Sequence, residues 1–500
     1  MNKKIMFERK SIYFIVFTIT IIGYLIYIMF IHSLNFNENY TIEILILSWL
    51  GILVALFVFW TWKQLTGKYF TLYTIFMLFF FLFNYGQPLM WAIGIHNPND
   101  IINGNLYTLG KANSSSILFA QSLTLISILM FHLGAILCFK PKLFKIDNYQ
   151  EYEDNYSNIT REAIYKVSII ISMVVIPITF YNIITDLIYA QSYGYKALHY
   201  DENRYIYPVF GLIQYLFFPT LVGLLIGSGY KKKVMLIVYI IFGLYLVINL
   251  FYGDRGLWIY SLMFLIFMSH TYYKKIPIKK FIFYGIIGTI SLYIVNTIVS
   301  IRDIGVNIDN ILEALSLENF PLITTVFEMG ESMKPTIVLI QYGWDVWPYA
   351  NSYLNSLIGI LSTEIFTLLN LPFDTISNWF SNEYLVISYG AGFSIVAEPL
   401  LNYGPFFSPL FMIILGYIIS SLTFLDKSIN FKKYPLRVFF AVSSMHAFTP
   451  LVRNHSHFVM KSWVFGVLIV FGLIIIMREI LIKKDQENQE LGNKYKITRE

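Results

Sequence analysis

Charged residues are scarce in this chain. Asp, Glu, Lys and Arg together make up 13% of the 500 residues, whereas roughly 25% is usual in soluble proteins. Hydrophobic residues make up 57%. A chain so poor in charge cannot cover its apolar surface in water, which excludes a soluble enzyme, a disordered tail and a disulfide scaffold. The composition therefore predicts an integral membrane protein.

Several motifs of soluble enzymes are also missing. Cys138 is the only cysteine, which excludes an internal disulfide and a zinc site built on several cysteines. The sequence has neither a Walker A motif nor a Gly-x-Gly-x-x-Gly motif, so nothing indicates nucleotide binding. The net charge is +6, but in a membrane chain the position of basic residues matters more than their sum. We expect no nucleic-acid partner, no cofactor and no bound metal.

Long apolar runs are the main feature that is present. A helix that crosses the hydrocarbon core needs about 20 mostly apolar residues. Twelve such spans are predicted, at Ile12–Ile31, Ile42–Trp60, Tyr69–Leu89, Ile117–Cys138, Val167–Ile188, Pro208–Gly227, Val234–Phe251, Leu257–Thr271, Phe281–Val299, Phe406–Phe424, Val438–Leu451 and Trp463–Met477. The first run is too long for a signal peptide and is not followed by small cleavage-site residues.

The distribution of Lys and Arg supports this count. With the N-terminus in the cytoplasm and the spans alternating, 28 of the 36 basic residues fall in cytoplasmic segments. The positive-inside rule predicts this asymmetry, and twelve spans return the C-terminus to the cytoplasm. We expect an all-α polytopic protein with about 12 transmembrane helices and both termini cytoplasmic.

One loop is much longer than the others. The expected organisation is helices 1–9 in residues 1–299, a large extracytoplasmic loop in 300–405, helices 10–12 in 406–482 and a cytoplasmic tail in 483–500. The run Leu357–Leu371 is read as a re-entrant or interfacial helix, because a full crossing would place four later basic residues outside. The loop is rich in aromatic residues, which suit either the headgroup level or stacking on sugar rings. They include Trp344, Trp347, Tyr349, Tyr353 and Trp379.

Three arginines are predicted at the outer ends of helices: Arg255, Arg302 and Arg453. A guanidinium group offers two parallel charged hydrogen bonds to phosphate oxygens, so three of them could hold a diphosphate at the headgroup boundary. The alternative is structural. Each side chain could reach the interface as an anchor or pair with a carboxylate such as Asp303 or Glu398.

Two outer carboxylates, Glu328 and Glu398, are flanked by apolar residues. Apolar surroundings raise the pKa of a carboxyl group and suit it to take a proton. The alternative for Glu398 is a structural role at a helix start, since Pro399 is typical of a first helical turn. The nearby pair His455 and His457 has no evident third metal ligand, and contact with an anion is the preferred reading.

Three parts of the second half of the chain carry motifs of a known family. They are Phe327–Met333 with Gln341–Trp344 and Ala350–Leu357, then Gly390–Gly404, then Gly253–Gly256 with its Arg-Gly turn. Together they resemble the O-antigen and capsule repeat-unit polymerases of the Wzy type. The resemblance covers about residues 252–454. The Arg-x10-Gly repeat of some members is absent after Arg204, Arg255 and Arg302.

The resemblance implies a glycosyltransferase-type polymerase in the bacterial plasma membrane. Its substrates would be undecaprenyl-diphosphate-linked oligosaccharides, and a chain-length regulator and a flippase are further partners to test. Arg255, Arg302 and Arg453 would hold the donor diphosphate. Glu328 or Glu398 would take the acceptor proton, with His455 or His457 as a further candidate base.

Two other functions stay open from the sequence. A lipid-linked oligosaccharide flippase has about a dozen spans and handles the same diphosphate, but it needs no large outer loop. An O-antigen-ligase-like transferase shares the arginines and the loop, and sequence barely separates it from a polymerase.

Overall fold

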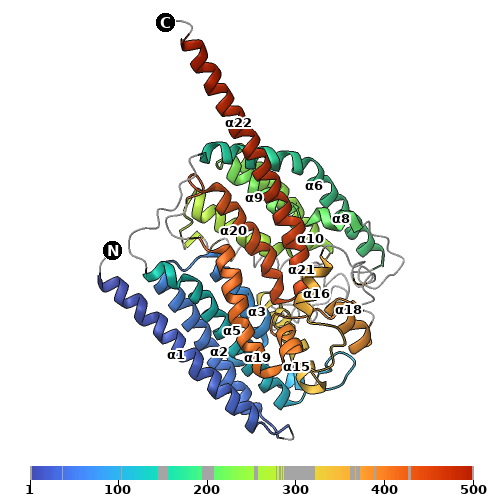
Figure 1. The fold of residues 1–500 in the computed structure, drawn as a ribbon. Helices are drawn as coiled ribbons and strands as arrows, with labels where there is room; N and C mark the ends of the chain where they lie inside the picture. The colour runs from blue at the N-terminus through green and yellow to red at the C-terminus, as the bar shows by residue number, and fades with distance from the viewer. Residues whose placement is uncertain are drawn as a thin grey trace.

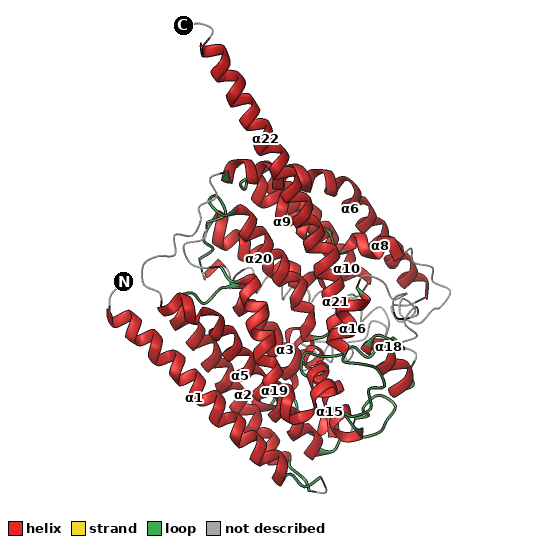
Figure 2. Cartoon of the chain, in the orientation of Figure 1, coloured by secondary structure: helices red, strands yellow, loops and turns green. Residues whose placement is uncertain are grey.

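The computed structural model describes the chain except for residues 1–2, 37, 103, 145–155, 194–207, 253–256, 278, 281–282, 284, 286–320, 361–365, 367–371, 388–389, 426–429 and 498–500. Every regular element in this part of the chain is a helix, and Figure 2 shows no strand there. The predicted all-α class is confirmed.

The longer helices form the body of the protein. They are α1 (Lys3–Ser33), α2 (Thr41–Thr66), α3 (Leu72–Ala92), α5 (Ser114–Phe144), α6 (Ser157–Tyr193), α9 (Phe217–Gly227), α10 (Lys232–Tyr252), α11 (Leu257–Met268), α19 (Ala397–Thr423), α20 (Pro435–Phe448) and α22 (Ile469–Ile497). Shorter helices connect them: α4 (Asn99–Ile102), α8 (Pro208–Gln214), α14 (Pro321–Gly330), α15 (Lys334–Tyr342), α16 (Ser352–Gly359), α18 (Ile376–Asn378) and α21 (Ser456–Lys461).

Nine helices within the described residues are long and apolar enough to cross a membrane. They coincide with nine of the twelve predicted spans. Two more predicted spans, Leu257–Thr271 and Val438–Leu451, fall on the shorter helices α11 and α20. The predicted span Phe281–Val299 lies largely outside the described residues. The protein is therefore a multi-pass membrane protein, and the total of twelve spans stays a prediction.

The helices are arranged in two groups that meet along α19 and α20. One group contains α1, α2, α3 and α5, and the other contains α6, α9, α10 and α22 (Figure 1). Large apolar side chains on α1 and α10, such as Phe14 and Phe251, point outward with 67% and 70% of their surface exposed. Lipid is the solvent that suits such a surface, and the helical backbone satisfies its own hydrogen bonds there.

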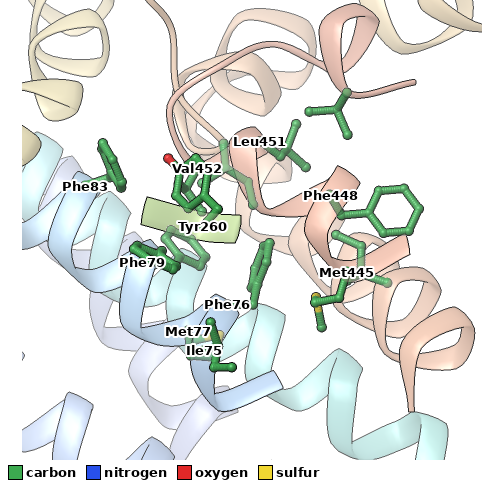
Figure 3. Close-up of a cluster of buried hydrophobic side chains, with 14 of the residues drawn as sticks. Ile75, Phe76, Met77, Phe79, Phe83, Tyr260, Met445, Phe448, Leu451 and Val452 are labelled. Atoms are coloured by element: carbon green, nitrogen blue, oxygen red, sulfur yellow. The ribbon is translucent and has the colours of Figure 1, made fainter. Parts of the chain in front are cut away.

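Aromatic side chains fill the contact between α3 and its neighbours. Phe76, Phe79 and Phe83 of α3 lie against Tyr260 of α11 and against the segment from Met445 to Val452 at the end of α20 (Figure 3). The ring centroids of Phe79 and Tyr260 are 4.7 Å apart and nearly perpendicular, an arrangement that aromatic pairs prefer. This packing fixes the segment that carries Arg453 and the two histidines.

Helix α19 is bent at Gly404, whose φ of +68° favours glycine. Pro409 has no N–H to donate to the carbonyl of Pro405, four residues earlier. The hydroxyl of Tyr27 in α1 donates to that carbonyl at 3.0 Å and satisfies it. The bend separates the first two turns of α19, which hold Glu398, from the apolar remainder of the helix.

The predicted interfacial helix at Leu357–Leu371 is only partly described. Helix α16 covers its first three residues, whereas residues 361–365 and 367–371 lie outside the described part. Helix α22 continues through most of the segment expected as a tail, to Ile497, and projects beyond the other helices (Figure 1).

Candidate functional site

Glu398 lies in the first turn of α19, and the sequence around it explains why the helix begins there. The N–H of Ala397 donates to Ser394 Oγ at 3.0 Å, and the N–H of Glu398 donates to the Ser394 carbonyl at 3.1 Å. Ser394 thus satisfies donors that the start of the helix would leave open. Pro399 fits the first turn because its missing N–H needs no partner there.

The carboxylate of Glu398 is fully buried and accepts three hydrogen bonds. Its Oε1 accepts from Ser352 Oγ at 2.7 Å and from Ser456 Oγ at 2.6 Å, and its Oε2 accepts from the Ser456 N–H at 2.8 Å. A buried charge is costly unless it is hydrogen-bonded in this way. Ser352 begins α16 and Ser456 begins α21, so one side chain of α19 joins two other helices.

Asn402, one turn after Glu398, completes the junction. Its amide nitrogen donates to Ser352 Oγ and to the Glu398 carbonyl, both at 2.8 Å. Its amide oxygen accepts from the Ser352 N–H at 2.8 Å. Ser352 is therefore held by both its backbone and its side chain, which fixes the start of α16 against α19.

We call the hydrogen-bonded side chains of Glu398, Ser352, Ser356, Ser456 and Asn402 the Glu398 network. Its hydroxyl protons can be counted against its oxygen–oxygen contacts. Besides the two contacts to Glu398 Oε1, Ser356 Oγ lies 2.7 Å from Ser456 Oγ and donates to the Ser352 carbonyl at 2.7 Å. Three hydroxyl groups thus carry three protons for four oxygen–oxygen contacts. A fourth proton, on Glu398 Oε1, gives every contact a hydrogen. In that protonated form Glu398 donates to Ser456 Oγ and Ser456 Oγ donates to Ser356 Oγ, whereas the ionised form accepts from Ser456 Oγ.

His455 and His457 stand next to the Glu398 network. Both are buried, with 9% and 5% of their surface exposed, and their rings are parallel with centroids 6.4 Å apart. Burial lowers the pKa of His455 to about 3, and His457 and Lys461 add to the effect. His455 is therefore neutral at neutral pH, and its low pKa makes the imidazole a weak base.

A small pocket, with room for about one water molecule, lies between these elements. It is lined by Trp347, Ser352, Asn355, Ser356, Phe373, Asp374, Thr375, Ile376, His455 and His457. Ser352 and Ser356 belong to the Glu398 network, so part of that network lines this pocket, which we call the serine–histidine pocket. Trp347 packs edge-on against Trp379, with centroids 5.0 Å apart, so part of the predicted aromatic loop meets here.

Arg453 lies two residues before His455, and its side chain is exposed. Its backbone is fixed: the N–H donates to the Pro450 carbonyl and the carbonyl accepts from the Phe393 N–H, both at 3.0 Å. Among the described residues no carboxylate lies within ion-pair distance of its guanidinium group. The guanidinium is thus available to an outside anion.

The other predicted site residues are distributed differently. Arg255 and Arg302 lie outside the described residues. Glu328 is exposed on α14, a helix that packs on α3, and it is not part of the Glu398 network. No group of three or more His, Cys, Asp or Glu side chains that could hold a metal ion occurs in the described part of the chain.

Sequence reasoning did not find Ser352, Ser356 and Ser456. A signal was present in Asn351-Ser-Tyr-Leu-Asn-Ser356, where the Asn-Ser pair recurs after four residues. That spacing places the two serines on one face of a helix. Polar side chains on one face of a short helix in an apolar chain indicate a buried polar junction.

Comparison with known proteins gives one match. The family model described as O-antigen polysaccharide polymerase Wzy matches residues 4–486. The match includes the first half of the chain, where the sequence motifs gave no resemblance. No curated protein and no solved structure matches the chain.

Proposed function

The chain belongs to the O-antigen polysaccharide polymerase Wzy family, and we propose that it joins lipid-linked oligosaccharide repeat units into a surface polysaccharide. The donor and acceptor are repeat units on undecaprenyl diphosphate at the outer face of the bacterial plasma membrane. The product is an O-antigen, a capsule or an exopolysaccharide. The observation that carries the proposal is the family match over nearly the whole of a multi-helix membrane chain.

The reaction is a transfer between two lipid-linked glycans. The bond between C1 of the donor glycan and its phosphate oxygen breaks, and C1 forms a bond to a hydroxyl oxygen of the acceptor. The acceptor hydroxyl loses its proton to a base, and undecaprenyl diphosphate leaves with the negative charge. The residues must therefore hold a diphosphate and accept one proton.

Arg255, Arg302 and Arg453 are the proposed diphosphate ligands. The guanidinium of Arg453 is exposed and has no carboxylate partner among the residues that the structure describes, which supports its part in this role. Phosphate oxygens accept two parallel hydrogen bonds from such a group, and their charge grows as the C1–O bond breaks.

The proposed proton acceptor is one of Glu328, Glu398 and His455. Of these, His455 lines the pocket and is neutral at neutral pH. The Glu398 oxygens face three donors, so we assign Glu398 the task of holding α16 and α21 in position. Glu328 remains a candidate base, because the sequence predicts it on the outer side of the membrane.

Deletion of the gene separates this function from its two rivals. We expect the deletion strain to carry single repeat units and no polymer, with the repeats accessible on the outer leaflet. Chromatography of its lipid-linked glycans measures this. Unattached polymer would indicate a ligase instead, and repeats confined to the inner leaflet would indicate a flippase.

Substitution of Arg453 by Lys is expected to shorten or abolish the polymer while protein levels stay normal. Lysine keeps the charge but loses the paired geometry that a guanidinium offers to phosphate. Gel profiles of polysaccharide from the complemented deletion strain measure the effect, and Arg255→Lys tests the second proposed ligand in the same assay. Lys334→Gln is the matched control, because that outer cation pairs with Glu331 at 2.6 Å.

The same proposal requires Arg453 to face the cell exterior. Cys138 is the only cysteine, so Cys138→Ser gives a background in which a new cysteine can be labelled alone. Arg453→Cys should react with a membrane-impermeant maleimide in intact cells. Labelling only after the cells are opened would reject the diphosphate role of Arg453.

A further inference from the structure

Three lysine-rich segments that are far apart in the sequence are brought together by aromatic side chains. Tyr230, between α9 and α10, stacks on Tyr273 with ring centroids 6.0 Å apart. Phe431, which precedes α20, packs edge-on against Tyr230 at 5.4 Å. Lysines follow each of these aromatic residues directly. We call them the lysine face, which consists of Lys231–Lys233, Lys274, Lys275, Lys432 and Lys433.

The charge of the lysine face is not balanced nearby. All of its lysines are exposed, and the segments 228–237, 269–280 and 430–437 contain no Asp or Glu. The ion pairs between described residues lie elsewhere in the chain. Lys232 and Lys233 therefore have no carboxylate partner among the residues that the structure describes. Like charges at such a cluster repel each other, and a bound anion would offset that repulsion.

The start of α10 adds to the positive charge. The Met235 N–H donates to the Lys231 carbonyl at 3.0 Å, and Lys232 and Lys233 are the first two residues of the helix. The N-terminus of a helix carries a partial positive charge, which favours anions and disfavours cations. The lysines thus stand where the helix alone would select against them.

Arg161 of α6 lies over the turn that leads into α10. A Cβ at Gly229 would lie 3.2 Å from Arg161 Nη2, so the glycine leaves space for the guanidinium group. The φ of Tyr230 is +60°, which is uncommon for a residue with a side chain. The ring of Tyr230 is buried, with 5% of its surface exposed, whereas the next three lysines are exposed. Tertiary packing therefore holds these cations in place.

The lysine face continues directly into a surface that faces lipid. Leu236, Ile237 and Ile240 follow Lys233 by three, four and seven residues, a spacing that places all four on one face of α10. The three apolar side chains are 60%, 54% and 53% exposed, and Leu244 on the same face is 54% exposed. A phospholipid has the same order of groups, a charged phosphate followed by acyl chains. A soluble phosphate or an acidic peptide would match only the lysines.

We propose that the lysine face binds the headgroup of an anionic phospholipid in the cytoplasmic leaflet, with an acyl chain along the exposed face of α10 from Leu236 to Leu244. The predicted spans place all three lysine-rich segments on the cytoplasmic side. An anionic leaflet attracts basic residues at the membrane boundary. The interaction is independent of the polymerase reaction.

Titration of the purified full-length protein with phosphatidylglycerol in an uncharged detergent tests the site. Native mass spectrometry measures the bound lipid, and phosphatidylcholine with the same acyl chains is the comparison without net charge. We expect the wild type to prefer phosphatidylglycerol. The double variant Lys232→Gln with Lys233→Gln should bind it roughly tenfold more weakly. Lys232→Arg with Lys233→Arg keeps both charges and should retain the binding.

The matched control is Lys483→Gln with Lys484→Gln. It removes the same charge from the part of α22 that projects beyond the other helices (Figure 1). Both lysines are exposed, and neither belongs to the lysine face. The control should bind phosphatidylglycerol as the wild type does.

The remaining outcomes would each overturn the proposal. Equal affinity for the two lipids, or unchanged binding in the Lys232→Gln and Lys233→Gln variant, would reject an anionic site. An equal loss in the control would show an effect of net charge alone. Displacement of the lipid by glycerol 3-phosphate would indicate a site for soluble phosphate. Lys432→Cys in the Cys138→Ser background, if labelled by an impermeant maleimide in intact cells, would place the lysine face outside.

Discussion

Alanine in place of Glu398 is expected to abolish polymer formation and to lower the melting temperature of the purified protein. The substitution removes the acceptor for Ser352 Oγ, Ser456 Oγ and the Ser456 N–H. Each buried donor left without a partner costs roughly 1–3 kcal/mol. The total is a large part of the roughly 5–15 kcal/mol that stabilises a typical folded protein.

A glutamine at position 398 distinguishes a structural role of Glu398 from a role in proton transfer. Its amide has the size of the carboxyl group and can both donate and accept, as a protonated Glu398 would. We therefore expect Glu398→Gln to stay folded and to make polymer at a reduced level. A folded but wholly inactive Glu398→Gln protein would return Glu398 to the role of base.

The control for both variants is Glu331→Ala. Glu331 lies in the predicted extracytoplasmic loop, and its half-exposed carboxylate pairs with Lys334 at 2.6 Å. An exposed pair of this kind contributes about 0–1 kcal/mol. The control should keep normal polymer length and melting temperature, which thermal denaturation in detergent and gel profiles measure side by side.

Replacement of Gly134 or Gly416 by Val is expected to remove nearly all folded protein. A Cβ at Gly134 of α5 would lie 2.0 Å from the Ile413 carbonyl oxygen, and a Cβ at Gly416 of α19 would lie 2.1 Å from that of Phe131. Both obstacles are backbone atoms, so no side chain can move aside. Small residues allow this close approach of two membrane helices.

The cost should exceed the roughly 1–3 kcal/mol of ordinary overpacking, because the whole helices must separate. Size-exclusion profiles of a fluorescent fusion measure the folded fraction. Gly243→Ala is the matched control, since it lies within α10 and its Cβ would meet nothing within 4 Å. A Gly134→Ala protein that melts at the wild-type temperature would show that α5 and α19 do not pack as described.

The α5–α19 contact also matters for the site. Helix α19 carries Glu398 and Asn402 in its first two turns, and α5 holds the remainder of the same helix. A shift between α5 and α19 would therefore move the junction with α16 and α21. We expect variants of Gly134 that still fold to lose polymer before they lose stability entirely.

The sequence by itself determined the solvent in which this chain folds and the helices that result. Apolar runs of about 20 residues leave no alternative to helices in lipid, because the backbone must satisfy its own hydrogen bonds there. Nine predicted spans coincide with helices that are long and apolar enough to cross a membrane. The motifs around Gly390–Gly404 were specific enough to indicate the family that the comparison then gave.

Only the tertiary structure decided which polar residues meet. Ser352 and Ser456 are 104 positions apart, and no periodicity relates them, yet both donate to one carboxylate of a third helix. The sequence could indicate that Glu398 was unusual, because its neighbours are apolar. It could not supply its partners, since those depend on how α16, α19 and α21 pack. His457 gained its place in a pocket for the same reason: contacts between distant segments are set by packing, whereas helix formation is set by neighbours along the chain.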